Sequence, residues 1–271
     1  MQLTAKSVQE EIAGLMDSYT GAISRVITAY SERRNRDRDI NWLALQATKE
    51  YGAMVYHARV MFRKAKDMES LESIRKSSED SFEEAEHYWG LMKILDWYLD
   101  GKPCEVREMW GYGDFTEALG PGPGMNKSLW PESHGYFELA QQQMQQTRSN
   151  WVRQVIAANI EGAAVAFHYL MSRLPATDEY MRRIVEHERS IAKDELHHGP
   201  EMIEELAKIV QSREEVEEAK QKLTDLRVRE LRQRNEQFLH PLTPAEINQL
   251  EEDFLQRRVE PISLFSMGVE V

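Results

Sequence analysis

The chain has 271 residues, of which 41% are hydrophobic and 30% are charged, and this composition indicates a folded globular protein rather than a disordered one. Its formal net charge of −12 argues against a nucleic-acid partner, because phosphate binding needs a basic surface. The sequence has no apolar run near the roughly 20 residues of a membrane span, no apolar secretory signal, and one cysteine, Cys104, so we expect a cytoplasmic protein without a membrane partner.

Apolar residues recur with the spacing of amphipathic helices along almost the whole chain. The first six predicted helices cover residues of about 8–30, 42–66, 69–99, 136–146, 150–174 and 176–210. Two capping boxes follow, Ser212 with Glu215 and Thr243 with Glu246, and they open helices that we expect to reach about residues 238 and 258. Residues 100–133 are instead rich in glycine, proline and aromatic residues, so we expect a crossover or lid there.

Two stretches of the chain repeat each other 111 positions apart, residues 50–57 (EYGAMVYH) and residues 161–168 (EGAAVAFH). The offset continues into the following predicted helix. As a result, the chain carries twice a glutamate that is followed 34 residues later by Glu-x-x-His. The six residues of this pattern are Glu50, Glu84, His87, Glu161, Glu195 and His198.

These residue types and spacings indicate a metal centre. Residues i and i+3 share one face of a helix, so each Glu-x-x-His can direct both side chains to one point. Antiparallel packing of four helices would gather all six side chains, the pattern of di-iron and di-manganese carboxylate bundles. Four carboxylates would neutralise two divalent ions, and carboxylate and imidazole ligands suit iron or manganese better than a structural zinc site. We therefore predict that the six residues are the metal ligands and the catalytic centre.

The alternative is a charged, solvated helix face whose repeat is accidental. It is less favoured because Glu50 and Glu161 lie in apolar helices, where an unpaired charge is costly. Glu83 and Asp194 precede the two Glu-x-x-His glutamates and could accept the second N–H of a ligating histidine.

Three further points concern histidines and small residues. His57 and His168 each lie seven residues, about 10 Å of helix, beyond their glutamates, so a hydrogen-bonded core histidine is favoured over a ligand, with an outer-sphere role between the two. No role is assigned to His134, His187, His197 and His240. The small residues Ser77, Ser81 and Ala192 near the ligands either leave room for a substrate or allow close helix packing.

At these residues the chain resembles the ferritin-like di-metal carboxylate superfamily, over about residues 42–99 and 150–210. Within it, residues 160–164 (IEGAA) and 193–198 (KDELHH) are similar to the catalytic subunit of the bacterial phenylacetyl-CoA epoxidase, although the chain shows no clear coenzyme A site. One departure is Gly199-Pro200 directly after the last histidine, where a kink either opens the site or disturbs the ligand geometry.

The resemblance implies an all-α fold: a ferritin-like four-helix bundle with an N-terminal lead-in helix and additional C-terminal helices. Residues 1–271 would then form a single domain, with core helices over about 42–99 and 150–210, the lid over 100–133 and a helical extension over 211–271.

The function expected from this pattern is that of a non-haem di-iron oxygenase or oxidase, an oxidoreductase of the monooxygenase type. Two Fe ions, with Mn as the alternative, would activate O₂ to hydroxylate or epoxidise a small organic substrate. Two ferrous ions supply only two of the electrons that full reduction of O₂ needs, so a reductase or ferredoxin partner is implied. We also expect a homo-oligomer or a multi-subunit complex. The alternatives are a ferroxidase or iron-binding ferritin-like protein, a di-manganese catalase, and a non-catalytic bundle subunit.

Overall fold

The computed structural model describes residues 4–101, 127–128, 130–195 and 198–266. Within these ranges the chain is helical and contains no strand, so the predicted all-α class is confirmed. No helix in the same ranges is both long enough and apolar enough to cross a bilayer. Most of the predicted lid over residues 100–133, including Cys104, lies outside the described residues.

The chain divides into two compact units, and each is described by itself. The first unit is Met1–Arg34 with Glu132–Val271, and the second unit is Asn35–Pro131. The single ferritin-like domain over residues 1–271 and the four-helix bundle stay predictions.

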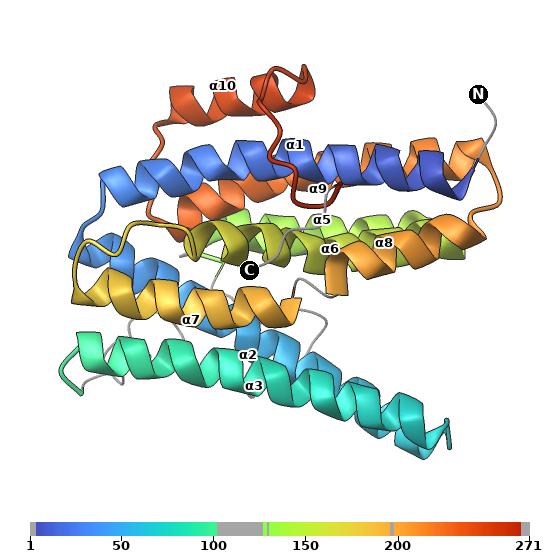
Figure 1. The fold of residues 1–271 in the computed structure, drawn as a ribbon, viewed down its shortest axis with the longest axis horizontal. Coiled ribbons are helices and arrows are strands. Elements are labelled where there is room, and N and C mark those ends of the chain that lie inside the picture. The colour runs from blue at the N-terminus through green and yellow to red at the C-terminus, as the bar shows by residue number, and fades with distance from the viewer. Residues whose placement is uncertain (1–3, 102–126, 129, 196–197, 267–271) are drawn as a thin grey trace. The chain divides into compact units, whose positions relative to one another are not determined.

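The second unit is an antiparallel hairpin of two long helices, α2 (Arg36–Lys66) and α3 (Leu71–Tyr98), which lie side by side in Figure 1. Helix α2 begins six residues before its predicted start because the Asn35 side chain caps its first turn, accepting a hydrogen bond from the Arg38 backbone N–H. The Ser70 side chain caps α3 in the same way. Side chains also tie the two helices together at both ends of the hairpin: the Tyr98 hydroxyl donates to Asp39 (2.9 Å), and Lys64 donates to Ser77 (2.9 Å).

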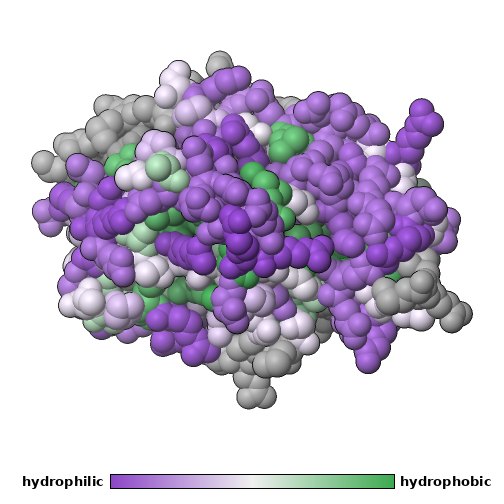
Figure 2. Space-filling view, turned by 90° about the horizontal axis from the view of Figure 1, so that it is seen from above, coloured by the Kyte–Doolittle hydropathy of each residue, from purple (hydrophilic) through white to green (hydrophobic). Residues whose placement is uncertain are grey.

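The first unit holds the remaining described helices. Helices α1 and α6 pack against each other and against both α8 and α9, and α10 packs against α9 and α1. Figure 2 shows the face that carries α10, where hydrophilic residues predominate and hydrophobic ones form small separate patches. The helices of this unit are α1 (Ala5–Glu32), α5 (Pro131–Gln146), α6 (Asn150–Met171), α7 (Glu179–Glu195), α8 (His198–Ile209), α9 (Arg213–Gln237) and α10 (Pro244–Leu255).

The helix predicted over residues 176–210 is described as two helices. Helix α7 ends at Glu195 and α8 begins at His198, with residues 196–197 outside the described ranges. Pro200 is the third residue of α8, where a proline is tolerated because the first N–H groups of a helix have no intrahelical acceptor. Gly199-Pro200 therefore lies at the start of a helix rather than inside one, where we expected it to form a kink.

Both predicted capping residues cap their helices, but only one capping box is complete. Thr243 and Glu246 exchange both hydrogen bonds at the start of α10. Ser212 accepts from the Glu215 N–H at the start of α9, whereas the Glu215 carboxylate accepts from the Gln211 N–H (3.0 Å) and from the Ser149 hydroxyl (2.5 Å). Glu215 thereby connects the start of α9 to the N-cap of α6.

The C-terminal segment, which carries no sequence motif, is held on α1. The Asp17 carboxylate accepts hydrogen bonds from the backbone N–H groups of Leu264 (2.8 Å) and Phe265 (2.7 Å). Gly21 lies one turn further along α1, and a Cβ at that position would stand 2.0 Å from the Glu260 carbonyl oxygen. The close approach of the segment to α1 therefore depends on a glycine.

Candidate metal centre

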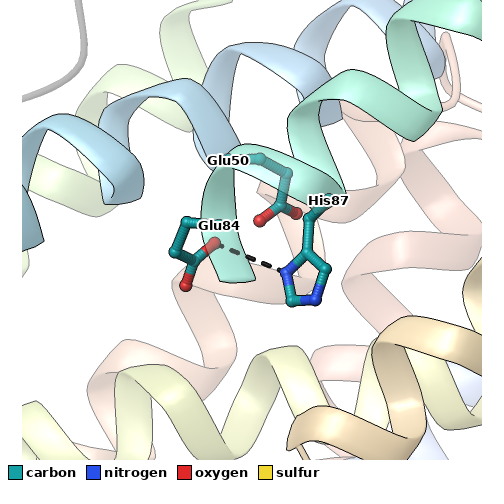
Figure 3. A group of neighbouring side chains, drawn as sticks. All are labelled: Glu50, Glu84 and His87. Carbon is teal, nitrogen blue, oxygen red and sulfur yellow. Dashed lines mark ion pairs between the residues drawn. The ribbon is translucent and has the colours of Figure 1, made fainter. Parts of the chain in front are cut away.

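Three of the six predicted ligands come together inside the second unit. Glu50 lies on α2, Glu84 and His87 lie on α3, and one ligand atom from each residue lies within 4.8 Å of the other two. The Glu84 Oε2 is 3.6 Å from the His87 Nδ1, and Figure 3 shows the three side chains directed toward one another. Among the described residues this is the only group of three or more such side chains close enough to hold one ion.

The local geometry follows from helix periodicity. Glu84 and His87 are three residues apart on α3, so they share one face of the helix, as the sequence predicts. Helix α2 packs along α3 and contributes Glu50, the last residue of its buried N-terminal part. All three side chains are buried, with 7%, 7% and 4% of their surface exposed for Glu50, Glu84 and His87.

The donor set fits a divalent cation. Two carboxylates held this close in a buried place repel each other when both are ionised, and a bound cation removes that repulsion. Two oxygen donors and one imidazole nitrogen suit iron, manganese or zinc, and the cluster contains no thiolate. The site can therefore bind one divalent ion with three protein ligands.

Gln46 also belongs to this site, although it was not among the residues predicted from the sequence. Its side-chain amide donates to the Glu50 carboxylate from one turn earlier on α2, and it is buried. A hydrogen bond of this kind fixes the orientation of a ligating carboxylate. The sequence indicates Gln46 only as a polar residue four positions before Glu50, on the predicted apolar stripe of the helix.

The other three predicted ligands belong to the first unit. Glu195 is the last residue of α7 and is buried, with 5% of its surface exposed. Glu161 lies within α6, and His198 is the first residue of α8. The side chains of Glu161 and His198 lie outside the described residues.

Each of the two repeat histidines faces an acidic residue on the neighbouring helix. His168 is buried, and its Nδ1 lies 2.7 Å from the Oε2 of Glu188, which is fully buried on α7. His57 is half-buried, and its Nδ1 lies 3.7 Å from the Oδ2 of Asp80 on α3. Neither acid was singled out from the sequence, because its partner is distant along the chain.

The remaining candidates occupy different surroundings. Asp194 is exposed and Glu83 is half-buried, and their predicted roles beside the ligands stay predictions. Ser77 accepts a hydrogen bond from Lys64, and Ser81 donates to the Met54 carbonyl (3.2 Å), so both serines contribute to close packing of α2 and α3.

Comparisons with known proteins identified no family: neither a scan of family models nor searches of curated proteins and solved structures found a match.

Proposed function

We propose that the protein is a non-haem di-iron oxygenase or oxidase that uses O₂ to oxidise a small organic substrate. The observation that carries the proposal is the buried cluster of Glu50, Glu84 and His87, whose residue types recur 111 positions later as Glu161, Glu195 and His198. The two triplets together would hold two ions, iron in the first instance and manganese as the alternative.

Helix register supports a level shared by positions 161 and 195, although it differs from that of the second unit, where the step reaches His87 rather than Glu84, the position equivalent to Glu195. In the second unit, a step of seven residues along each helix leads from the facing pair His57 and Asp80 to the ligands Glu50 and His87. In the first unit, α6 and α7 are in contact, and the same step from His168 and Glu188 leads to positions 161 and 195. Seven residues are about two helical turns, so positions 161 and 195 share one level of that helix pair.

The protein residues prepare the site for its chemistry. Reduction of O₂ is the chemistry that two bound ferrous ions supply. The buried carboxylates would hold the ions and balance their charge, Gln46 donates a hydrogen bond that orients one of these carboxylates, and the burial of the ligands would keep bulk water from the ions. The small organic substrate, the electron-donating reductase or ferredoxin and assembly into an oligomer or multi-subunit complex are parts of the same proposal.

The test is anaerobic loading of the full chain with Fe(II), followed by exposure to O₂ in an oxygen electrode. We expect rapid O₂ uptake at two Fe(II) per chain, renewed on each addition of reductant and increased by a suitable organic substrate. Glu84→Ala should abolish the uptake, whereas Glu86→Ala, an exposed glutamate on the same helix, should leave it intact.

Three results would overturn the oxygenase proposal. Uptake that continues with added Fe(II) far beyond two ions per chain would instead indicate a ferroxidase. Disproportionation of hydrogen peroxide by the manganese-loaded chain would indicate a catalase. Absence of any metal-dependent O₂ uptake would indicate a non-catalytic subunit.

A further inference from the structure

The two repeated triplets of ligands are built differently, although their residue types are the same. The first triplet is Glu50, Glu84 and His87, and the second triplet is Glu161, Glu195 and His198. Three features hold the first triplet in place, and each of them is altered at the offset of 111. Ligands that are in place before the ion arrives bind it more tightly, because less conformational freedom is lost on binding.

The first feature is the continuity of the helix that carries Glu-x-x-His. Glu84 and His87 both lie inside α3, so the helix itself sets their spacing. In the second triplet, Glu195 is the last residue of α7 and His198 is the first residue of α8. The spacing of this second pair therefore depends on how two helices are joined, and the geometry of one helix does not set it.

The second feature is the hydrogen bond that Gln46 donates to the Glu50 carboxylate, which orients this ligand. The residue equivalent to Gln46 is Ala157, one turn before Glu161 on α6. An alanine side chain has no N–H group to donate. Position 157 therefore gives Glu161 no support of the kind that Glu50 receives.

The third feature is an aromatic contact beside the ligands. Tyr51 and Tyr88 each directly follow a ligand, one on α2 and the other on α3, and their rings lie 5.6 Å apart between centroids. The contact joins the two helices next to the first triplet. The equivalent residues are Gly162 and Gly199, which have no side chain to make it.

One buried contact does join two of the helices that carry the second triplet. His168 on α6 lies 2.7 Å from Glu188 on α7, and both side chains are buried. The pair lies seven residues, about 10 Å of helix, from positions 161 and 195. It therefore aligns α6 with α7 but does not join α7 to α8, which carries His198.

We propose that the two ions bind in a fixed order, the first tightly to the first triplet and the second more weakly to the second triplet. This order rests on the proposed function and adds its regulation, because O₂ uptake needs both ions and the supply of metal decides whether the second triplet is filled. Groups that hydrogen-bond to metal ligands typically change metal affinity about 10- to 100-fold. With three such differences between the triplets, the two dissociation constants differ at least about 100-fold.

Anaerobic titration of the full chain with Mn(II) tests the order, with the free Mn(II) measured by electron paramagnetic resonance. We expect two binding steps with dissociation constants at least about 100-fold apart. Glu84→Ala should remove the tight step and Glu195→Ala the weak step, whereas Glu86→Ala, at an exposed position on α3, should keep both. Two steps of equal affinity in the wild type, or loss of the tight step in Glu195→Ala, would overturn the order.

A transfer of the orienting amide tests the physical cause of the order. Ala157→Gln places an amide one turn before Glu161, as Gln46 stands one turn before Glu50, and should tighten the second step about 10-fold while the first step stays unchanged. Ala157→Leu is the matched control, because it adds a side chain without an N–H donor at the same exposed position. Equal affinities for the second ion in these two variants would overturn carboxylate orientation as a cause of the order.

Oxygen uptake measured along an Fe(II) titration separates the order from the proposed function. We expect no uptake below one ion per chain and a rise between one and two, because the first ions fill only the first triplet. Equal binding steps together with O₂ uptake would overturn the order and leave the oxygenase proposal standing. Unequal steps without O₂ uptake would overturn the oxygenase proposal alone, and one ion or none per wild-type chain would overturn both.

Discussion

His168 and Glu188 form a buried pair between α6 and α7, with the imidazole Nδ1 2.7 Å from the carboxylate Oε2. His57 and Asp80 face each other between α2 and α3 in the second unit, at 3.7 Å. The acids do not occupy equivalent positions: at the offset of 111, the position equivalent to Glu188 is Ser77. The repeat therefore preserves the histidine and its acidic neighbour, while the acid comes from a different turn of the helix.

Replacing Glu188 should weaken the first unit. We expect Glu188→Leu to lower the free energy of unfolding by about 2–3 kcal/mol, because it leaves a buried imidazole without its acceptor. Glu186→Leu is the control, since Glu186 pairs with Arg182 at an exposed position and its loss should cost less than about 0.5 kcal/mol. Urea denaturation of both variants measures the difference, and equal losses would contradict the assigned role of the pair.

Gln46 should support metal binding through Glu50. We expect Gln46→Leu to weaken metal affinity about 10- to 100-fold, since the carboxylate loses the hydrogen bond that orients it. Competition with a coloured chelator measures the affinity. Gln249→Leu, an exposed position on α10, should have no effect, and an unchanged affinity in Gln46→Leu would remove Gln46 from the site.

The pairing of α1 with α9 should give the protein an acid-sensitive part of its stability. The hydrogen bond from Arg213 lowers the pKa of Glu11 to about 2, and Lys220 contributes to the same effect from 2.7 Å. A lowered folded-state pKa stabilises the protein above the ordinary value of 4.5, and this stabilisation disappears as the pH falls toward 2.

Glu11→Gln tests this dependence. It should destabilise the protein by about 1 kcal/mol at pH 7 and by less as the pH falls below 4.5, because the Glu11 carboxylate of the unfolded wild type then binds a proton, whereas that of the folded state keeps its charge until the pH approaches 2. Glu10→Gln, at an exposed position where Glu10 pairs with Lys6, serves as the control. A Glu11→Gln penalty that is constant with pH would show that the charge of Glu11 is not what stabilises the contact.

Gly21 and Gly14 on α1 should respond to alanine in opposite directions. Gly21→Ala should destabilise the protein by about 1–2 kcal/mol, because the new Cβ meets the Glu260 carbonyl oxygen. A Cβ at Gly14 has nothing within 4 Å, so Gly14→Ala should stabilise the helix by about 0.5–1 kcal/mol. Thermal unfolding measures the shift of the unfolding temperature in each variant. Shifts of the same sign would contradict the docking of the C-terminal segment on α1.

Local sequence rules predicted most of the helices and the proximity of three of the six predicted ligands, Glu50, Glu84 and His87. The i, i+3 spacing correctly placed Glu84 beside His87, and the repeat correctly added Glu50 from the neighbouring helix. These successes rest on periodicity, which a sequence displays directly.

Contacts between distant residues were harder to foresee. Nothing near Glu215 in the sequence indicates that its carboxylate binds Ser149 as well as the start of its own helix. The early start of α2 at Arg36 depends on the Asn35 cap within a stretch dense in charges, where apolar periodicity is weak. The partners of His57 and His168 likewise depend on how two helices are aligned, which spacing along one helix does not specify.

Metal content of the full chain is the most direct test of the central proposal. After anaerobic reconstitution with Fe(II) or Mn(II) and removal of loosely bound ions, elemental analysis should find two ions per wild-type chain. Glu84→Ala and Glu195→Ala should each lose at least one ion, whereas Glu79→Ala, at an exposed position on α3, should keep both. Fewer than one ion per wild-type chain, or full retention in both ligand variants, would contradict a two-metal centre built from these residues.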